Sequence, residues 1–421
     1  MKKLLIILSL FPLINIAQDL ESGGGEYIMH KHNSCLSKQD RFVIWNEIKE
    51  NLKYLENKNI IPKKQKSVLF GWPLRKDTLL EFNNYYGISN FVDQDTTTGI
   101  LLDYNCQIRT YDGHRGTDFF TWPFPWYLYD NDYIDVIAGE DGIIVNKHDG
   151  HDDDHCLSTA GGSWNAVYVR HNDGSIVWYG HLKKNSLTSK SIGQSVTKGE
   201  YLGKVASSGV STGPHLHLEI HDSSWNLTDP FHGLIDPFQG SCNSLNSNSW
   251  WLNQRNYRVP VLNALLTHNA KPIHGCPGIN EAPNMSNSFI VGDSVFFAAY
   301  YSDRELGDSA KYKIITPSNT IWNSWNQVAS TTYNASWYYW RKLLPHNGPF
   351  GLWKFEIEFK GQVYTHEFLY SGSLSIENQN KELKKLIRVS DILGRETKVI
   401  NNKLLLFIYD DGTVEKKIII Q

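Results

Sequence analysis

The chain has few methionines, no excess of positive charge and almost no long apolar run. Its 421 residues include 3 Met, and 41 Lys and Arg against 44 Asp and Glu give a formal net charge of −3. A chain without basic excess is not expected to bind nucleic acid. Beyond the first residues no segment is apolar enough over a sufficient length to cross a bilayer, so we expect no transmembrane segment. Hydrophobic residues make up 41% and charged residues 20%, which excludes a largely disordered chain.

Residues 1–17 have the organisation of a secretory signal peptide. Two lysines follow Met1, an apolar run extends from Leu4 to Ile14, and the small residue Ala17 precedes Gln18. As a helix this run would be about 16 Å long, too short for a membrane span. A buried first helix is the alternative. We therefore expect a secreted or cell-surface protein.

The five cysteines include no C-x-x-C pair, which argues against a zinc ribbon. In an oxidising compartment an odd number predicts two disulfides and one free thiol. Order along the chain favours Cys106–Cys156 and Cys242–Cys276 and leaves Cys35 free, although connectivity does not follow from sequence.

Changes in composition and periodicity predict a mainly β chain. Its expected parts are a signal peptide (1–17), an N-terminal helical or pro-like segment (18–96), a domain of antiparallel strands (97–240), a connecting segment (241–285), an immunoglobulin-like β-sandwich (286–372), and a linker with a small C-terminal β unit (373–421).

One amphipathic helix is predicted between Arg41 and Leu55. Its apolar residues recur at helical spacing, at Phe42, Trp45, Ile48, Leu52 and Leu55. Because that face has to be buried, we expect the helix to pack on the domain that follows it. It lies either along the cleft of that domain, as an inhibiting segment, or beside it, as a structural collar.

The strongest chemical signal is the run Gly213-Pro-His-Leu-His-Leu-Glu219. Alternation along a strand places His215, His217 and Glu219 on one face and the leucines on the other. The leucine face suits a core, and the imidazoles then share a cleft. Two surface histidines with no metal would produce the same short pattern.

A second motif supplies the remaining ligands of a metal site. Glycines flank His114 in the run before Asp118, and they permit a tight backbone that directs both side chains to one point. One imidazole, one carboxylate and one histidine of the H-x-H strand make three ligands suited to Zn²⁺. The fourth position stays open for water, as in catalytic zinc sites. His181, in a Tyr-Gly-His-Leu run, would by itself be interpreted as a surface residue at a strand end.

Taken together, these motifs resemble those of the lysostaphin/LytM-type zinc endopeptidases, over about residues 97–240. The resemblance rests on His-x-x-x-Asp, Tyr-Gly-His-Leu and Gly-x-Ser-x-Gly-Pro-His-x-His-x-Glu in this order. It implies one zinc ion per chain, held by His114, Asp118 and His217. It also implies that His215 and His181 act on the water and on the transition state.

The expected chemistry is peptide-bond hydrolysis by a zinc-activated water. Zinc lowers the pKa of a bound water toward about 7. His215 lies two residues from a ligand and is the expected general base, while His181 would help the metal stabilise the oxyanion. Glu219 and Asn165 are candidates for hydrogen bonds to the ligands.

The last 45 or so residues resemble the C-terminal sorting domain of the type IX secretion system of Bacteroidetes. The features are Val389-Ser-Asp-Ile-Leu-Gly-Arg395, a following β run and an Asp-Gly turn. They imply passage across the outer membrane by the type IX secretion machinery.

The family resemblance predicts a zinc metalloendopeptidase acting on bacterial cell-wall peptidoglycan or on Gly-rich peptides. The alternative is a catalytically inactive relative that serves as a cell-wall binding or activator module. Because such relatives typically lose ligands and this chain keeps its histidines and Asp118, the enzyme is the favoured interpretation.

Overall fold

A computed structural model describes residues 21–29, 35–61, 68–95, 97–156, 162–233, 242, 249–276, 281–372, 386–400, 403–409 and 412–418. The chain forms two compact units, Met1–Gly372 and Ser373–Gln421. The predicted signal peptide and the linker predicted after residue 372 lie outside the described residues. The predicted mainly β fold is confirmed, since strands dominate and the described ranges contain two helices. Within these ranges no helix is long and apolar enough to cross a membrane.

The elements of the first half of the chain are β1 (Glu21–Glu26), α1 (Lys38–Asn57), β2 (Leu74–Lys76), β3 (Tyr86–Asn90), β4 (Thr117–Thr121), α2 (Pro125–Asp130), β5 (Ile134–Ile137), β6 (Gly142–His148), β7 (Ala166–His171), β8 (Ile176–Gly180), β9 (Ser195–Val196), β10 (Tyr201–Lys204), β11 (His215–His221) and β12 (Leu227–Thr228).

The strands that follow are β13 (Val261–His268), β14 (Ser288–Ile290), β15 (Ser294–Ser302), β16 (Ser309–Ile315), β17 (Ile321–Val328), β18 (Ala335–Leu343), β19 (Gly351–Phe359), β20 (Gln362–Ser371), β21 (Leu386–Ser390), β22 (Leu404–Tyr409) and β23 (Val414–Ile418).

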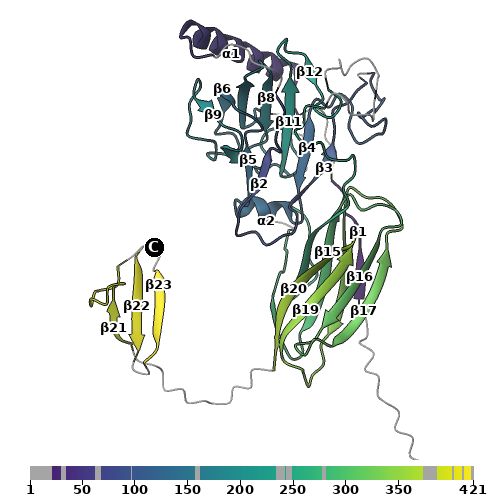
Figure 1. Cartoon of the computed structure of the whole chain (residues 1–421), viewed down its shortest axis with the longest axis vertical. Coiled ribbons are helices and arrows are strands. Elements are labelled where there is room, and N and C mark those ends of the chain that lie inside the picture. Colours follow the sequence, from purple (N-terminus) through teal and green to yellow (C-terminus); the bar gives the residue numbers. More distant parts are fainter. Residues whose placement is uncertain are drawn as a thin grey trace, which may run out of the picture. The chain divides into compact units, whose positions relative to one another are not determined.

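The H-x-H strand β11 lies within an eight-stranded antiparallel sheet. The order is β3-β4-β11-β8-β7-β6-β9, with β12 also paired to β11 (Figure 1). On one face, Leu216 and Leu218 enter a core shared with residues of the small sheet β10-β5-β2, such as Val136 and Leu202. The other face carries the odd-numbered residues of β11, which are the polar ones. The sheet begins before residue 97, because β3 pairs with β4.

Helix α1 packs on that second face of the sheet. A capping box starts it, because Ser37 Oγ accepts a hydrogen bond from the Asp40 amide while the Ser37 amide donates to Asp40. The helix buries Ile44, Ile48, Leu52 and Leu55 against residues of β6, β7 and β8, including Val145, Tyr168 and Trp178. Phe42, predicted on the buried face, is 60% exposed, because Ile44 and not Phe42 lies in line with Ile48.

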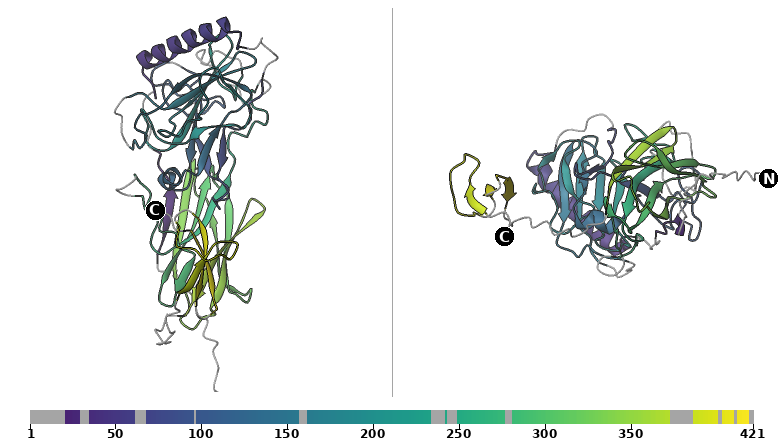
Figure 2. Two further views of the ribbon diagram at one scale, coloured as in Figure 1. Left: turned by 90° about the vertical axis from the view of Figure 1, so that its left-hand side faces the viewer. Right: turned by 90° about the horizontal axis from the view of Figure 1, so that it is seen from below.

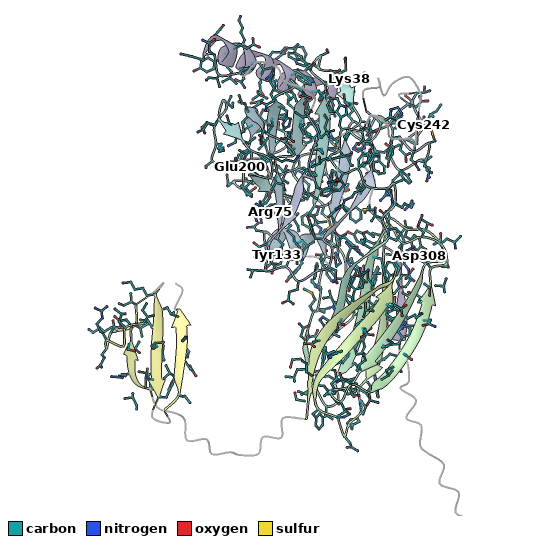
Figure 3. All side chains as sticks on the ribbon, in the orientation of Figure 1. Lys38, Arg75, Tyr133, Glu200, Cys242 and Asp308 are labelled. Carbon is teal, nitrogen blue, oxygen red and sulfur yellow. A yellow bond between two sulfur atoms is a disulfide. The ribbon has the colours of Figure 1, made fainter. Side chains whose placement is uncertain are left out.

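The β-sandwich is built from two sheets, ordered β1-β18-β15-β13 and β14-β20-β19-β16-β17. Its core holds many of the aromatic side chains that stand out in the sequence, such as Tyr312, Trp340 and Trp353. Two of its strands come from outside 286–372, since β1 pairs with β18 and β13 with β15. Figure 2 shows the sandwich strands from two further directions, and Figure 3 labels Asp308 in the loop before β16.

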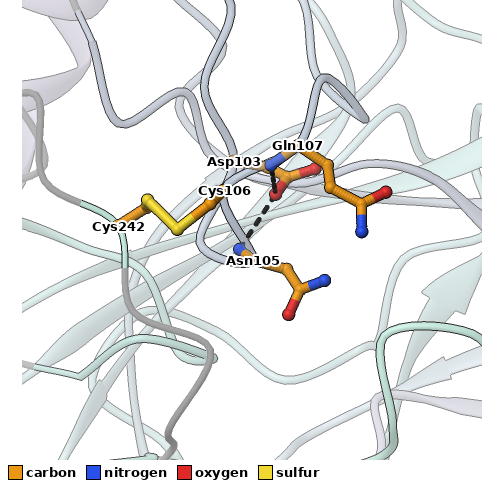
Figure 4. Close-up of a disulfide and its surroundings, with 5 residues drawn as sticks. All are labelled: Asp103, Asn105, Cys106, Gln107 and Cys242. Atoms are coloured by element: carbon orange, nitrogen blue, oxygen red, sulfur yellow. Dashed lines mark hydrogen bonds between the residues drawn. A yellow bond between two sulfur atoms is a disulfide. The ribbon is translucent and has the colours of Figure 1, made fainter.

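The disulfides differ from the predicted pairing. Cys106 bonds to Cys242 (Figure 4) and Cys156 to Cys276, while Cys35 is free as predicted. The prediction followed chain order, but the folded chain brings distant loops together. Tyr104, beside Cys106, stacks on Phe231 with ring centroids 5.1 Å apart. That aromatic contact brings the loop of Cys106 to the segment that leads toward Cys242.

The C-terminal unit contains an antiparallel sheet in the order β21-β22-β23. Val389, Leu405 and Phe407 form its small apolar core. These residues form a cluster of their own, distinct from the cores of the first unit.

Candidate metal centre

The pairing of β4 with β11 brings the two sequence motifs together. In this register His217 lies opposite Asp118, and Leu218 opposite Thr117. Gly116 makes the approach possible, because a Cβ atom there would lie 2.6 Å from the His217 ring. The ring therefore occupies space that any larger residue at position 116 would take.

Three of the expected ligand atoms converge, and they come from the two motifs. His114 Nε2 lies 3.1 Å from Asp118 Oδ1 and 3.3 Å from His217 Nδ1, and His217 Nδ1 lies 2.9 Å from Asp118 Oδ1. Two nitrogen ligands about 2.0–2.1 Å from a tetrahedral zinc ion are about 3.3 Å apart. The three residues are fully buried and form one of the groups able to hold a metal. Their nature and spacing fit zinc.

The outer ring atoms of both histidines have acceptors. His114 Nδ1 lies 2.7 Å from the carbonyl oxygen of Phe91, and His217 Nε2 lies 3.3 Å from a carboxylate oxygen of Glu219. A carbonyl and a carboxylate only accept, so these outer nitrogens donate, and the inner nitrogens are the ones that can present lone pairs to a metal. Glu219, a candidate partner of the ligands in the sequence, thus lies within hydrogen-bonding distance of His217.

The carboxylate of Asp118 is held in its charged form. Asn90 Nδ2 donates to its second oxygen at 3.0 Å. Burial raises the pKa of Asp118, but His114, His217 and His215 outweigh burial and hold this pKa well below its usual range.

Two more imidazoles face the same point. His181 Nδ1 lies 2.5 Å from the Ser208 carbonyl and His215 Nδ1 lies 2.9 Å from that of Gly213, so both Nδ1 atoms donate. Their rings are 4.4 Å apart between centroids. His215 Nε2 lies 3.7 Å from Asp118 Oδ1, so this nitrogen is directed at the ligand group.

Comparison with known proteins identifies the domain around this centre. Residues 127–230 match Peptidase family M23. By this similarity we call the domain around the centre the M23 domain. The match includes His181, His215 and His217, whereas His114 and Asp118 precede it.

Two curated relatives align with part of this chain. An "Uncharacterized metalloprotease" of Haemophilus influenzae is 32% identical over 108 residues, which is 26% of this chain and 18% of the relative. The "DD-carboxypeptidase/endopeptidase Mpg" of Neisseria meningitidis serogroup B is 42% identical over 84 residues, 20% of this chain and 16% of the relative. The chain thus spans less than a fifth of the length of these relatives.

Two solved structures are also similar. The catalytic domain of the antimicrobial peptidase lysostaphin from Staphylococcus simulans is 25% identical, covers 34% of this chain and 89% of that one, and has a TM-score of 0.23. The catalytic domain of a mutant of the prophage-encoded M23 protein EnpA from Enterococcus faecalis is 21% identical, covers 42% and 98%, and has a TM-score of 0.19.

Glu219 connects the M23 centre to α1, which the sequence did not predict. Arg41 Nη1 donates to its two oxygens at 2.6 and 2.8 Å, and His221 Nε2 lies 2.8 Å from Oε1. Burial raises the pKa of Glu219, but Arg41, His217 and His221 hold it well below its usual range. A fully buried carboxylate therefore joins a metal-facing histidine to the N-terminal helix.

Asn165, the other expected partner of the ligands, has a different position. Its Oδ1 accepts from the His151 amide, and its Nδ2 donates to the carbonyls of His151 and Leu182. It holds the backbone immediately after His181. It therefore supports the position of that imidazole, through hydrogen bonds to backbone groups and not to a ligand atom.

Cys35 is a further residue of the centre that the motifs did not indicate. Its sulfur lies 3.6 Å from His217 Nδ1 and 3.0 Å from the hydroxyl of Tyr111, and its side chain is 2% exposed. Cys35, His181 and His217 form a second group able to hold a metal. The only available signal was that the odd cysteine precedes the M23 domain.

A cavity of about 460 Å³ lies beside the centre. Asp118 and His215 line it from the M23 side, and Tyr27 and Met29 line it from the N-terminal segment. A peptide bond that entered this cavity would reach the side chain of His215.

Proposed function

We propose that this protein is a secreted zinc metalloendopeptidase that hydrolyses peptide bonds in bacterial cell-wall peptidoglycan or in Gly-rich peptides. The observation that carries the proposal is the convergence of His114 Nε2, Asp118 Oδ1 and His217 Nδ1 to within 2.9–3.3 Å of one another, beside two further imidazoles. When bound there, zinc would polarise a peptide carbonyl and activate a water molecule.

His215 is the proposed general base. Its Nδ1–H is engaged with the Gly213 carbonyl, so Nε2 is the atom that can accept a proton from the attacking water. The same atom can then give this proton to the amide nitrogen that leaves. The 3.7 Å between His215 Nε2 and Asp118 Oδ1 keeps that nitrogen next to the ligand group.

His181 is proposed to stabilise the negative charge that develops on the carbonyl oxygen. Its Nδ1–H is held by the Ser208 carbonyl, which aims Nε2 at the centre. With a proton on Nε2, His181 would donate a hydrogen bond to the oxyanion. Its backbone lies in the left-handed region, with φ of 62°, at the bend where β8 ends. Such strained positions recur at functional sites.

The substrate class is inferred from the relatives. The meningococcal relative is named a DD-carboxypeptidase/endopeptidase, and lysostaphin is named an antimicrobial peptidase. Carried to this chain, those names favour peptides of the bacterial cell wall. A peptide lies extended across such a site at about 3.3 Å per residue, so several substrate residues on either side of the cleaved bond contact the sheet.

Metal content and digestion test this proposal directly. We expect about one zinc ion per purified chain, by elemental analysis. Purified peptidoglycan and Gly-rich peptides are digested side by side, with fragments read by mass. Because Cys35 contacts His217, both the wild-type chain and Cys35→Ala are assayed. Removing zinc with a chelator should abolish cleavage and adding zinc should restore it. A chain that binds no zinc would instead support the inactive, wall-binding relative.

The C-terminal unit is proposed to be an export signal for the type IX secretion machinery. Its separate core and its place outside the unit Met1–Gly372 support a role apart from catalysis. We expect a chain ending at Gly372, supplied with another export route, to keep the melting temperature and cleavage rate of the full chain. A folded but inactive product of this truncation would contradict that role.

A further inference from the structure

We propose that a groove between the M23 domain and the β-sandwich binds an extended peptide carrying a basic side chain, which adds to the sandwich as a further strand. The groove has a volume of about 810 Å³ and shares no lining residue with the cavity at the metal centre. The proposal therefore does not rest on the peptidase function. It rests on two open strand edges, a fixed wall and the charge of the groove.

Strand β13 provides the first open edge. It ends the sheet β1-β18-β15-β13, and on its outer side the Thr267 carbonyl accepts from the Ser286 amide at 3.0 Å. In an antiparallel strand, residues two apart direct their N–H and C=O groups to the same side. The backbone of Leu265, which lines the groove, is therefore directed outward. No strand of the described ranges pairs with this side of β13 at Leu265.

Strand β20 of the other sheet provides the second open edge (Figure 1). The Leu369 amide donates to the Asn287 carbonyl at 2.7 Å, and β14 pairs with β20 from Leu369 onward. By the same alternation, Glu367 and Thr365 direct their backbone groups to this side, and both residues line the groove. Among the described strands none pairs with β20 there.

A hydrogen bond fixes the two edges relative to each other. His366 of β20 has its Nε2 atom 2.9 Å from the Thr267 hydroxyl of β13, which itself donates to the Ser286 carbonyl at 2.7 Å. The hydroxyl has one hydrogen, so His366 Nε2 is the donor. Open strand edges are templates for another extended chain, and strand addition is a recurring mode of peptide recognition.

The M23 side of the groove is a loop held from behind by a lysine. Lys76 Nζ donates to the carbonyls of Leu80 and Phe82 at 3.0 and 2.6 Å. Tyr127 and Tyr133 continue this wall, with ring centroids 5.7 Å apart. A wall fixed in this way is formed before a ligand arrives, which lowers the entropy cost of binding.

The charge of the groove favours a basic peptide. Glu81 of the loop and Glu367 of β20 are exposed carboxylates on opposite walls, and no lysine or arginine is among the described lining residues. Lys354 lies opposite Glu367 in the register, but its Nζ is 3.4 Å from the side-chain oxygen of Asn319. A lysine of a bound peptide would complement the two carboxylates. The regular backbone groups of the edges match a peptide and not a glycan.

Binding of short labelled peptides to the full chain tests the proposal by fluorescence anisotropy. The probe is the capped peptide Thr-Val-Lys-Val-Thr-Val, and a chelator removes metal so that the probe is not cleaved. One matched peptide has glutamate in place of lysine. A second is N-methylated at every residue except the lysine, so it keeps the charge and loses most backbone donors. Both should bind at least about fivefold more weakly than the probe.

Substitutions locate the bound peptide. Glu81→Gln and Glu367→Gln should each weaken binding of the lysine peptide about two- to fivefold. Thr365→Pro removes an outward N–H, a change that edge strands tolerate, and should weaken binding at least about threefold. Glu50→Gln is the matched control, because it changes an exposed carboxylate of α1 outside the groove. Melting temperatures are compared throughout, and the glutamate variants should melt like the wild-type chain.

Several results would overturn the inference. Equal affinity for the lysine and glutamate peptides would remove the charge argument, and equal affinity for the N-methylated peptide would exclude strand addition. Unchanged binding by the double variant Glu81→Gln/Glu367→Gln would place the peptide elsewhere. A soluble chitin oligosaccharide that binds where the lysine peptide does not would assign the groove to glycan. Dimerisation that the peptide does not reverse would assign the edges to a second copy. None of these results changes the expected zinc content, so the proposed peptidase function is tested separately.

Discussion

Replacing His217 with alanine is expected to leave the protein without bound zinc, whereas His215→Ala keeps zinc and loses turnover. His217 contributes Nδ1 to the ligand group and its other nitrogen contacts Glu219, so its removal takes away one of the three proposed ligands. His215 contributes no atom to that group. Since general acid–base groups contribute about 10²–10⁴-fold, cleavage by His215→Ala should fall by that factor.

The measurement is zinc per chain by elemental analysis together with cleavage rate, each in the wild-type and Cys35→Ala backgrounds. His346→Ala is the matched control, because it removes an exposed imidazole of the sandwich and should change neither quantity. Asp118→Ala should behave as His217→Ala does. A zinc-free His215→Ala beside a fully loaded His217→Ala would reverse the assignment of ligand and base.

A chain that begins near Gly99 is expected to lose its fold. The deletion removes β1, α1, β2 and β3, and four aliphatic side chains of α1 are buried against the sheet. At about 1.5–3 kcal/mol for each buried aliphatic side chain, α1 alone contributes about 6–12 kcal/mol. Whole domains have stabilities of about 5–15 kcal/mol. This expected loss of the fold corresponds to the structural collar, which was one of the two alternatives for this segment in the sequence analysis.

Thermal melting and solubility of the shortened chain check this prediction. The chain ending at Gly372 is the matched deletion, because it removes a separate unit and should melt like the full chain. A soluble product starting near Gly99 with an unchanged melting temperature would contradict it.

Local patterns predicted much of the candidate site. Alternation in β11 predicted that His215, His217 and Glu219 share one face, and the leucines enter the core on the other face as expected. The glycines around His114 predicted a tight approach, and Gly116 does leave room for the His217 ring. These predictions succeed because strand alternation and glycine geometry are properties of a few consecutive residues.

The N-terminal helix shows that local patterns predict an element but not the surface against which it packs. Its spacing predicted a helix with one apolar face, and a helix forms over Lys38–Asn57. The pattern could not decide which surface would cover that face, nor exclude Phe42 from it. The answer depended on which strands form the sheet and in what order, which periodicity does not encode.

Residue types, the order of the motifs and the spacing of apolar residues thus determined the mainly β class and the three expected ligands. They also determined which side chains of the H-x-H strand share a face. Only the tertiary structure decided the disulfide partners, the ion pair of Arg41 with Glu219 and the contact of Cys35 with His217. Cys106 and Cys242 are 136 residues apart in sequence, Arg41 and Glu219 are 178, and Cys35 and His217 are 182. Contacts over such separations arise when whole faces of helix and sheet pack together, because burial of their apolar residues brings along the polar side chains between them.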